Sequence, residues 1–320
     1  MTGIGAIVRK ELEDHFSSYR FIILFALIAM VSLITTYMVG VSLRDELGGI
    51  AKPKFIFLML FTSTGPLFSL VQFVSFFGPL IGLVLGFDSI NRERSDGTLS
   101  KLASQPIYRD AIVNGKFLSG VITIVIMLTS ILFVVSGLGL TLIGVVPGIE
   151  EVWRIFIYLI ISVFYISFWL GISILFSIIF RSIATSALAT LAVWIFFSFF
   201  ISMGASVLAN AFVPLNQNTQ ENPEIVMKHA KIQRAVSLTS PMQLYNDSTA
   251  IIIDPTRKTT RSLIFMGPIE QFSSERFSRP LNLLQSINIV IPHIITLIAI
   301  TFICFAISYI VFMKQEIRSI

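Results

Sequence analysis

A short polar stretch, GFDSINRERSDGTLSKLASQP at residues 86–106, stands between two long apolar runs of this chain. It carries six charged side chains: Asp88, Arg92, Glu93, Arg94, Asp96 and Lys101. Carboxylates and guanidinium groups mixed at this density can form ion pairs with a second surface. They do not make a catalytic site, because the sequence has no paired histidine and carboxylate spacing and no cluster of cysteine and histidine. The chemistry that this stretch offers is binding of a partner.

The second half of the polar stretch predicts a short helix. Residues 96–98 are typical of a turn followed by a helix N-cap, and Leu99 and Leu102 then recur at helical spacing until Pro106 ends the element. A helix of about two turns is too short to be stable alone in water. Its apolar edge must therefore pack on something, unless the stretch is an ordinary solvated loop whose charges only hold the membrane topology.

Composition places the chain in a membrane. Of its 320 residues, 55% are hydrophobic and 13% are charged, about half the charged fraction of a soluble domain. Lys and Arg exceed Asp and Glu by 23 to 18, and in a membrane protein this excess indicates orientation rather than binding of nucleic acid. Cys304 is the single cysteine, so the chain can form no internal disulfide and no cysteine metal site.

Apolar runs of about 20 residues predict six membrane-spanning helices. They cover residues 21–43, 66–87, 117–146, 155–180, 183–208 and 287–313. Gly65-Pro66 could kink or split the second run, which is also apolar from residue 55. Only Arg181 and Ser182 separate the fourth and fifth runs, which indicates a tight hairpin, with one merged or re-entrant segment as the alternative. We expect an all-α polytopic membrane protein.

Basic residues in the short loops indicate that both termini and residues 86–106 are cytoplasmic. The short loops on the opposite side then hold only Arg44, Lys52, Lys54 and Arg154. Before the first span, apolar residues recur at helical spacing: Ile4, Val8, Leu12, Phe16 and Tyr19. This pattern predicts an interfacial amphipathic helix over residues 1–20, and the alternative is a solvated tail.

The predicted spans lack a source of energy. None of the six cores contains Asp, Glu, Lys or Arg, and His293 is the one ionisable side chain expected to enter them. The sequence therefore shows no evident proton relay. Gly115-Lys116 is followed by Phe117 rather than Ser or Thr, so it is not a nucleotide-binding P-loop. If the chain moves a cargo uphill, the energy must come from another polypeptide, which would dock on the inner surface.

The order of residues around the polar stretch resembles the inner loop of ABC exporter permeases of the type-2 class. Asp-x-Ile-x-x-Glu-Arg-x-x-Gly-Thr-Leu at residues 88–99 precedes Pro106 and Gly115-Lys116-Phe117, as in that family. Segments at residues 8–14, 180–187, 240–245 and 314–317 are similar to further family segments. The similarity is closest to the NosY-like branch, which is associated with maturation of multi-copper enzymes.

The resemblance implies a coupling helix between spans two and three, seated in a cleft of a separate ATP-binding subunit. The docking residues would be Glu93, Arg94, Gly97, Thr98, Leu99 and Leu102. In this hypothesis the two leucines anchor the helix, Glu93 and Arg94 pair at the rim of the cleft, and residues from Arg181 to Thr185 add a smaller contact. The resemblance also implies two ATPase subunits, which bind ATP and Mg²⁺, and a second permease chain, identical or different. This chain would bind no cofactor itself.

Two sets of small and polar residues suggest how the spans pack. Gly78, Gly82 and Gly86 leave one face of the second span without side chains, which favours close helix packing within one subunit or at the dimer seam. Polar residues in the second and fifth spans could line a pathway or simply bond to the backbone: Ser69, Gln72, Ser75, Ser198 and Ser202.

The domain organisation follows as one transmembrane domain over residues 1–320. Residues 1–20 form the interfacial helix, 21–208 carry five spans, 287–313 form the sixth span and 314–320 a cytoplasmic tail. We expect residues 209–286 to form a small extracytoplasmic cap or a loosely ordered loop. The functional hypothesis is a non-enzymatic permease subunit in the plasma membrane, and the alternative is a stand-alone membrane protein such as an immunity or sensor component.

Overall fold

The computed structural model describes residues 3–46, 55–62, 69–98, 108–214, 223–255 and 280–315. All regular structure in these ranges is helical. The elements are α1 (Gly3–Ser17), α2 (Tyr19–Glu46), α3 (Ile56–Thr62), α4 (Leu70–Gly86), α5 (Asn91–Ser95), α7 (Arg109–Ile143), α8 (Ile149–Ile179), α9 (Ile183–Ile195), the π-helix η1 (Phe196–Phe200), α10 (Ile201–Phe212), α11 (Pro223–Ser237), α12 (Pro241–Ile253) and α14 (Leu283–Lys314).

Six helical segments of the described chain are long and apolar enough to cross a membrane. They begin and end close to the apolar runs of the sequence, so the prediction of six spans is confirmed. The second span starts at Leu70, later than predicted, because Ser69 and Gln72 form a capping box at its first turn. Residues 63–68, with Gly65-Pro66, lie outside the described residues, and the apolar residues before them form the separate helix α3.

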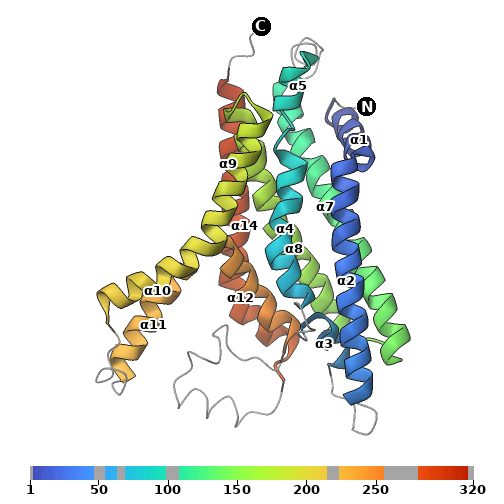
Figure 1. Ribbon diagram of the computed structural model, residues 1–320, viewed down its shortest axis with the longest axis vertical. Coiled ribbons are helices and arrows are strands. Elements are labelled where there is room, and N and C mark those ends of the chain that lie inside the picture. The colour runs from blue at the N-terminus through green and yellow to red at the C-terminus, as the bar shows by residue number, and fades with distance from the viewer. Residues whose placement is uncertain are drawn as a thin grey trace.

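The bundle is built around α8, against which α4 and α14 pack (Figure 1). A Cβ on Gly82 would lie 2.7 Å from the backbone oxygen of Ile166, and one on Gly86 would lie 2.7 Å from the Cβ of Ser173. The glycine face of α4 therefore lies on α8 of the same chain. On the other side, Ser308 of α14 donates to the carbonyl of Gly171 at 3.2 Å. Small residues allow both helices to approach the central one closely.

A tyrosine on α8 completes the hydrogen bonding of α4. Pro79 lies inside α4 and has no N–H, so the carbonyl of Ser75 loses its helical donor. The hydroxyl of Tyr165 donates to that carbonyl at 2.7 Å, and the tyrosine is fully buried. A carbonyl without a donor is costly at membrane depth. Tyr165 therefore permits the proline in α4.

We expect Tyr165→Phe to lower the free energy of unfolding by about 1–3 kcal/mol, because it leaves a buried acceptor unpaired. Thermal denaturation of the detergent-purified chain would measure the loss. Tyr37→Phe is the matched control, because Tyr37 on α2 is 55% exposed and its hydroxyl can be replaced without burying an unpaired group. Equal melting temperatures for the two variants would contradict the assignment.

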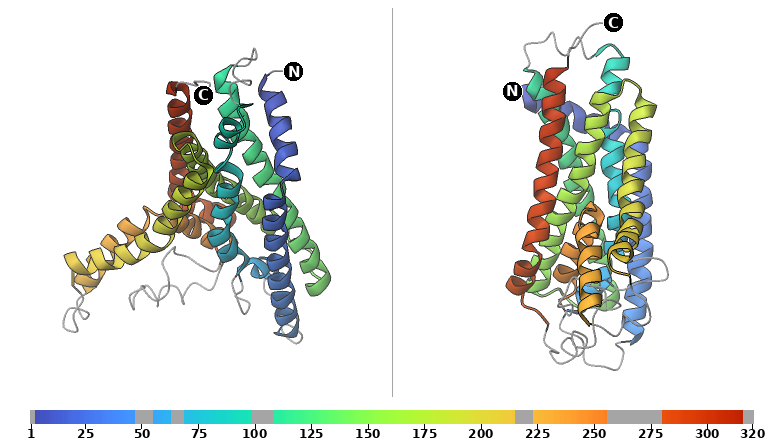
Figure 2. Two further views of the ribbon diagram at one scale, coloured as in Figure 1. Left: turned by 45° about the horizontal axis from the view of Figure 1, so that its top comes forward. Right: turned by 90° about the vertical axis from the view of Figure 1, so that its left-hand side faces the viewer.

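The fifth span bends away from the bundle. The π-helix η1 lies between α9 and α10, and α10 diverges from α8 and α14 with α11 packed beside it (Figures 1 and 2). We call α10 and α11 the arm. A π-helical turn changes the direction of a helix locally, which accounts for the position of the bend.

The segment between the fifth and sixth spans returns into the bundle. The hydroxyl of Ser240, at the start of α12, donates to the carbonyl of Phe197 in the middle of the fifth span at 2.9 Å. Tyr245 is fully buried and its hydroxyl lies 3.0 Å from that of Ser162, in the middle of α8. The expected cap or loose loop over residues 209–286 is thus wrong for α12, which packs against α8 and α14 as part of the core. Residues 215–222 and 256–279 lie outside the described residues.

The end of the bundle near α3 is held by the first two turns of α8. Arg154 is completely buried and donates to the carbonyls of Ile252 and Leu281 at 2.9 and 2.7 Å. Glu151 accepts from the backbone N–H of Phe57 at 3.1 Å, near the start of α3. The start of α8 therefore fixes α3, the end of α12 and the start of α14.

Candidate functional site

Four charged side chains meet where α1, α5 and α7 converge, and we call them the charge cluster. The Nζ atom of Lys116 on α7 lies 2.8 Å from Oε1 of Glu11 on α1 and 3.1 Å from Oε1 of Glu93 on α5. Lys10 on α1 also reaches Oε1 of Glu93, at 3.2 Å. The side chains of Lys116, Glu11 and Glu93 are 3%, 9% and 10% exposed, so these three form a buried junction of three helices, with the half-exposed Lys10 at its edge.

A glycine allows α1 to come close enough to α7 for this junction. A Cβ on Gly115 would lie 2.7 Å from Cγ2 of Ile7, which is buried on the α7 side of α1. Glu11 lies one turn beyond Ile7, and Lys116 follows Gly115 in sequence. The helix crossing therefore brings the two charged residues together. Since all four charges lie within one small volume, two cations and two carboxylates balance one another.

The electrostatics of Lys10 reflect its neighbours. Burial lowers the pKa of its ammonium group, but the carboxylates of Glu93 and Glu11 raise it by more, so the pKa lies above its ordinary value. Lys10 therefore stays protonated at every physiological pH. Its role in the cluster is that of a fixed positive charge.

The connection from α4 to α5 is attached to the end of α8. The hydroxyl of Ser177 accepts hydrogen bonds from the backbone N–H groups of Ile90 and Asn91 at 3.0 and 3.1 Å. The amide of Asn91 also donates to the carbonyl of Ser182, in the turn between α8 and α9, at 3.4 Å. Both predicted docking elements, the stretch after α4 and the turn after α8, are thus joined to one another.

Gln315, directly after α14, joins three further elements at the same end of the bundle. It accepts from Arg94 of α5 at 2.9 Å through its side chain and from Arg109 of α7 at 2.6 Å through its carbonyl. Its amide donates to the carbonyl of Ile178 on α8 at 3.0 Å. The ends of α5, α7, α8 and α14 are therefore bonded into one unit.

The predicted docking residues divide into an exposed set and an engaged set. Gly97, Thr98, Arg181 and Thr185 are exposed. Gly97 adopts φ +66°, a left-handed conformation that suits glycine and turns the chain after α5. Leu99 and Leu102, the predicted anchors, lie outside the described residues.

Glu93 and Arg94 lie in a different setting from the expected rim. Glu93 is 7% exposed and its carboxylate belongs to the charge cluster, while Arg94 is half-buried against Gln315. Both side chains bond to other parts of this chain. They therefore fix the position of the exposed Gly97 and Thr98, which follow them in sequence. A direct contact between either residue and a partner stays a prediction.

The residues predicted to line a pathway do not share one environment. Ser69 and Gln72 bond to each other as the cap of α4, and Ser75 is buried in the core. Ser198 lies half-buried on η1, and Ser202 is exposed on α10. The described structure therefore does not bring these five residues together.

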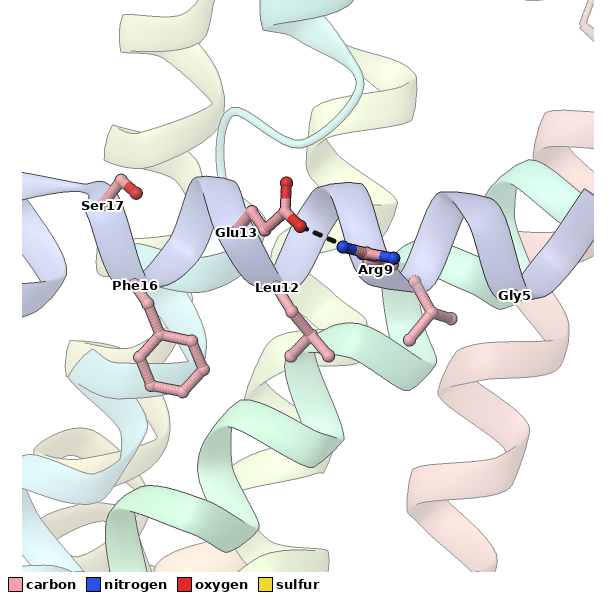
Figure 3. Close-up of a pocket in the computed structure, with 7 residues that line it drawn as sticks. Gly5, Arg9, Leu12, Glu13, Phe16 and Ser17 are labelled. Carbon is pink, nitrogen blue, oxygen red and sulfur yellow. Dashed lines mark hydrogen bonds and ion pairs between the residues drawn. The ribbon is translucent and has the colours of Figure 1, made fainter.

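Helix α1 has an apolar side that no other described element covers. It lines an open groove of about 510 Å³ with Leu12 and Phe16, which project to the same side of the helix, while Arg9 pairs with Glu13 (Figure 3). Ile4 and Phe16 are 37% and 41% exposed. The helix forms where the spacing predicts it, and its location at a membrane interface stays a prediction.

The residues that hold the site together were only partly visible in the sequence. Glu93 belonged to the predicted stretch, but Glu11 lies 105 residues from Lys116, and Gln315 lies 221 residues from Arg94. A charged residue directly before an apolar run, as Lys116 is, was the one local signal. Its partners depend on how distant helices cross.

Comparison with known proteins relates the whole chain to one family. The family model described as ABC-2 family transporter protein matches residues 5–317. Among individual proteins, the chain is 31% identical over 117 residues to the probable ABC transporter permease protein NosY of Stutzerimonas stutzeri. That alignment covers 37% of this chain and 38% of the relative.

Proposed function

The chain belongs to the ABC-2 family of transporter proteins, and from this premise we propose that it is the transmembrane subunit of an exporter driven by separate cytoplasmic ATPase subunits. The observation that carries the proposal is that two exposed segments, Gly97 with Thr98 and Arg181 with Thr185, are joined by the bond from Asn91 to Ser182. Thr98 also bonds to the carbonyl of Glu93, a member of the buried charge cluster. An exposed docking surface needs such a rigid base if it is to transmit force.

The contacts of α5 suggest how a push from an ATPase would travel. The charge cluster connects α5 to α1 and α7, Ser177 connects it to α8, and Gln315 connects it to α14. Displacement of α5 would move the adjoining ends of these helices together, because each bond would otherwise break. Such a movement at one end of packed helices can change access at the other.

The proposed assembly contains more than this chain. Two permease chains would form the pathway, either two copies or two related chains, and two ATPase subunits would bind ATP and Mg²⁺. The end of the bundle with α1 and α5 would face the cytoplasm of a cell whose plasma membrane the chain spans, with both termini inside. The relative from Stutzerimonas stutzeri, described as a probable ABC transporter permease, is consistent with this role.

Co-purification tests the docking assignment. We expect the double substitution Leu99→Asp and Leu102→Asp to reduce recovery of the ATPase with the tagged permease by at least about 10-fold, since two apolar anchors become charged. The measurement is the ratio of ATPase to permease after affinity purification from membranes, with membrane insertion checked by carbonate extraction.

The matched control places the same two changes at the opposite end of the bundle. Val146 and Ile149 are 80% and 76% exposed, and their substitution by Asp should leave the ATPase bound. Full recovery of the ATPase with the Leu99 and Leu102 variant would contradict the docking assignment. A wild-type chain that retains no P-loop ATPase would favour the alternative, a stand-alone membrane protein.

A further inference from the structure

Three arginines from separate elements lie near Gln315, at the end of the bundle that carries α5 (Figure 1). Arg94 of α5 donates to the side chain of Gln315 at 2.9 Å, and Arg109 at the start of α7 donates to its carbonyl at 2.6 Å. The amide of Gln315 donates to the carbonyl of Ile178, three residues before Arg181. Arg181 is near enough that its positive charge acts on Arg94. We call Arg94, Arg109 and Arg181 the arginine cluster.

The arginine cluster has no acidic partner within the part of the chain that the structure describes. None of its three guanidinium groups forms an ion pair with a described carboxylate. The carboxylates that adjoin it in sequence bond elsewhere: Glu93 pairs with Lys116 at 3.1 Å, and Asp110 accepts from the backbone N–H of Ala111 at 2.9 Å. Like charges therefore lie together here without an acidic side chain to balance them, which costs free energy.

The arginine cluster also holds many unused hydrogen-bond donors. A guanidinium group carries five N–H donors in a planar fork. Within the described ranges Arg94 and Arg109 each donate one hydrogen bond and Arg181 donates none, and Nε of Arg109 is buried without a partner there. Such a fork fits the oxygens of a phosphate or carboxylate group, which it can bind through two bonds at once. The cluster is therefore suited to an anion.

The position of the arginine cluster favours a lipid as the source of that anion. The guanidinium of Arg109 lies over the ring of Phe312, in the last turn of the sixth span, 5.8 Å from the ring centre. Exposed apolar or aromatic side chains adjoin the cluster in sequence: Tyr108 at 84%, Ile179 at 46% and Met313 at 39% exposed. Tyrosine at the end of a span is typical of a membrane interface. An anionic lipid offers a phosphate to the arginines and acyl chains to these side chains, whereas a soluble acidic partner offers only the charge.

We propose that the arginine cluster binds the phosphate of an anionic phospholipid in the leaflet at this end of the bundle. The phosphate would accept from Arg181 and from the unused donors of Arg94, with the acyl chains beside Ile179 and Met313. Basic pockets between membrane helices bind anionic headgroups in this way. On the orientation proposed above, the lipid belongs to the cytoplasmic leaflet.

The bound lipid would stabilise the connection between the two docking segments. Its negative charge lies between Arg94 and Arg181 and removes their repulsion, so α5 stays against the turn after α8. Asn91 of α5 donates to the carbonyl of Ser182 in that turn at 3.4 Å, a long bond that this neutralisation would support. Thr185 stays exposed, so the lipid leaves that part of the docking surface to the ATPase. The site needs no ATPase and so goes beyond the proposed function.

Lipid binding to the purified full chain, without an ATPase, tests the proposal. Native mass spectrometry in detergent would measure binding of dioleoyl phosphatidylglycerol, with dioleoyl phosphatidylcholine as the zwitterionic reference. We expect the parent to bind phosphatidylglycerol at least about 10-fold more tightly than phosphatidylcholine. Arg181→Gln should weaken phosphatidylglycerol binding about 5-fold, the contribution of one basic residue at an anionic headgroup, and leave phosphatidylcholine binding unchanged.

Thermal denaturation separates lipid binding from a structural role of Arg181. Its side chain makes no hydrogen bond or ion pair with described residues, so the fold does not depend on it. In phosphatidylcholine nanodiscs, Arg181→Gln should melt at or above the temperature of the parent, because its repulsion with Arg94 is gone. The variant should lose the added stability that phosphatidylglycerol gives the parent. Arg20→Gln is the matched control and should bind lipid like the parent, since Arg20 is 61% exposed and already paired with Asp88 at 3.0 Å.

Four outcomes would overturn the proposal. The first two are equal binding of both lipids by the parent and undiminished phosphatidylglycerol binding by Arg181→Gln. The third is equally tight binding of glycerol phosphate, the soluble headgroup, which would indicate an anion site that needs no lipid. The fourth is an Arg181→Gln chain that keeps the lipid but loses the ATPase, which would assign the arginine cluster to the protein partner. The lipid measurements contain no ATPase, so their failure leaves the proposed function and its Leu99 and Leu102 test untouched.

Discussion

Replacement of Lys116 by Met should destabilise the chain by about 3–5 kcal/mol, because it removes one partner from a buried ion pair and leaves charge uncompensated. Glu11 and Glu93 both approach the ammonium group of Lys116, at 2.8 and 3.1 Å, and both are buried. Lys10 lies farther from Glu11, at 3.7 Å, and is about half exposed. It cannot replace Lys116.

The same substitution should uncouple ATP hydrolysis from transport. In reconstituted membranes that contain the proposed ATPase, we expect Lys116→Met to reduce export by at least about 10-fold while ATP hydrolysis continues. The physical reason is that α5 loses its attachment to α1 and α7, so its movement no longer displaces them. Thermal denaturation and the ratio of transport to ATP hydrolysis are the two measurements.

An exposed ion pair on the same helix provides the control. Arg9 and Glu13 lie 3.1 Å apart, but their side chains are 73% and 67% exposed, and such a pair contributes at most about 1 kcal/mol. Arg9→Met should therefore behave like the parent. The triple variant Glu11→Gln, Glu93→Gln and Lys116→Met removes all three charges and should regain most of the lost stability. A Lys116→Met protein that melts with the parent would show that the cluster is not a buried junction.

Features of the fold that depend on local sequence were predictable. Runs of about 20 apolar residues identify the spans wherever they fold, and glycines four residues apart mark a packing face whatever it packs against. The polar stretch at residues 86–106 stands out as a candidate site because charge is rare in this chain. These signals need no knowledge of which helices are neighbours.

Features that depend on long-range packing were not predictable. The return of α12 rests on contacts between Tyr245 and α8, 83 residues away, which the sequence of α12 alone does not identify. The burial of Glu93 depends on where α1 crosses α7. For the same reason His293 was noticed alone, because its partners Arg234 and Asp247 lie in a segment that the sequence placed outside the membrane.

The structure connects the two ends of the bundle through α8. At one end Ser177 of α8 binds the start of α5, and at the other Arg154 and Glu151 fix α3, α12 and α14. A displacement of α5 can therefore reach α12 only if α8 moves as one body with its neighbours. Close packing of α4 on α8 is the condition for this.

Because α4 must pack closely on α8, we expect the second large effect, a loss of stability, for Gly82→Ala. The added Cβ would lie 2.7 Å from both the carbonyl oxygen of Ile166 and the backbone nitrogen of Leu170. Backbone atoms in the middle of a packed helix cannot rotate away as a side chain can, so α4 must shift from α8. Overpacking of this kind costs about 1–3 kcal/mol or more, and the α4 shift also strains the bond from Tyr165 to Ser75.

Gly137→Ala is the matched control, because a Cβ at that position in α7 meets nothing within 4 Å. There the same substitution should leave the stability unchanged or raise it by up to about 1 kcal/mol, since alanine favours a helix more than glycine does. Thermal denaturation of both variants in detergent, and the yield of folded protein from membranes, give the comparison. If Gly82→Ala were as stable as Gly137→Ala, α4 and α8 would not be in backbone contact, and α8 could not carry force between the two ends.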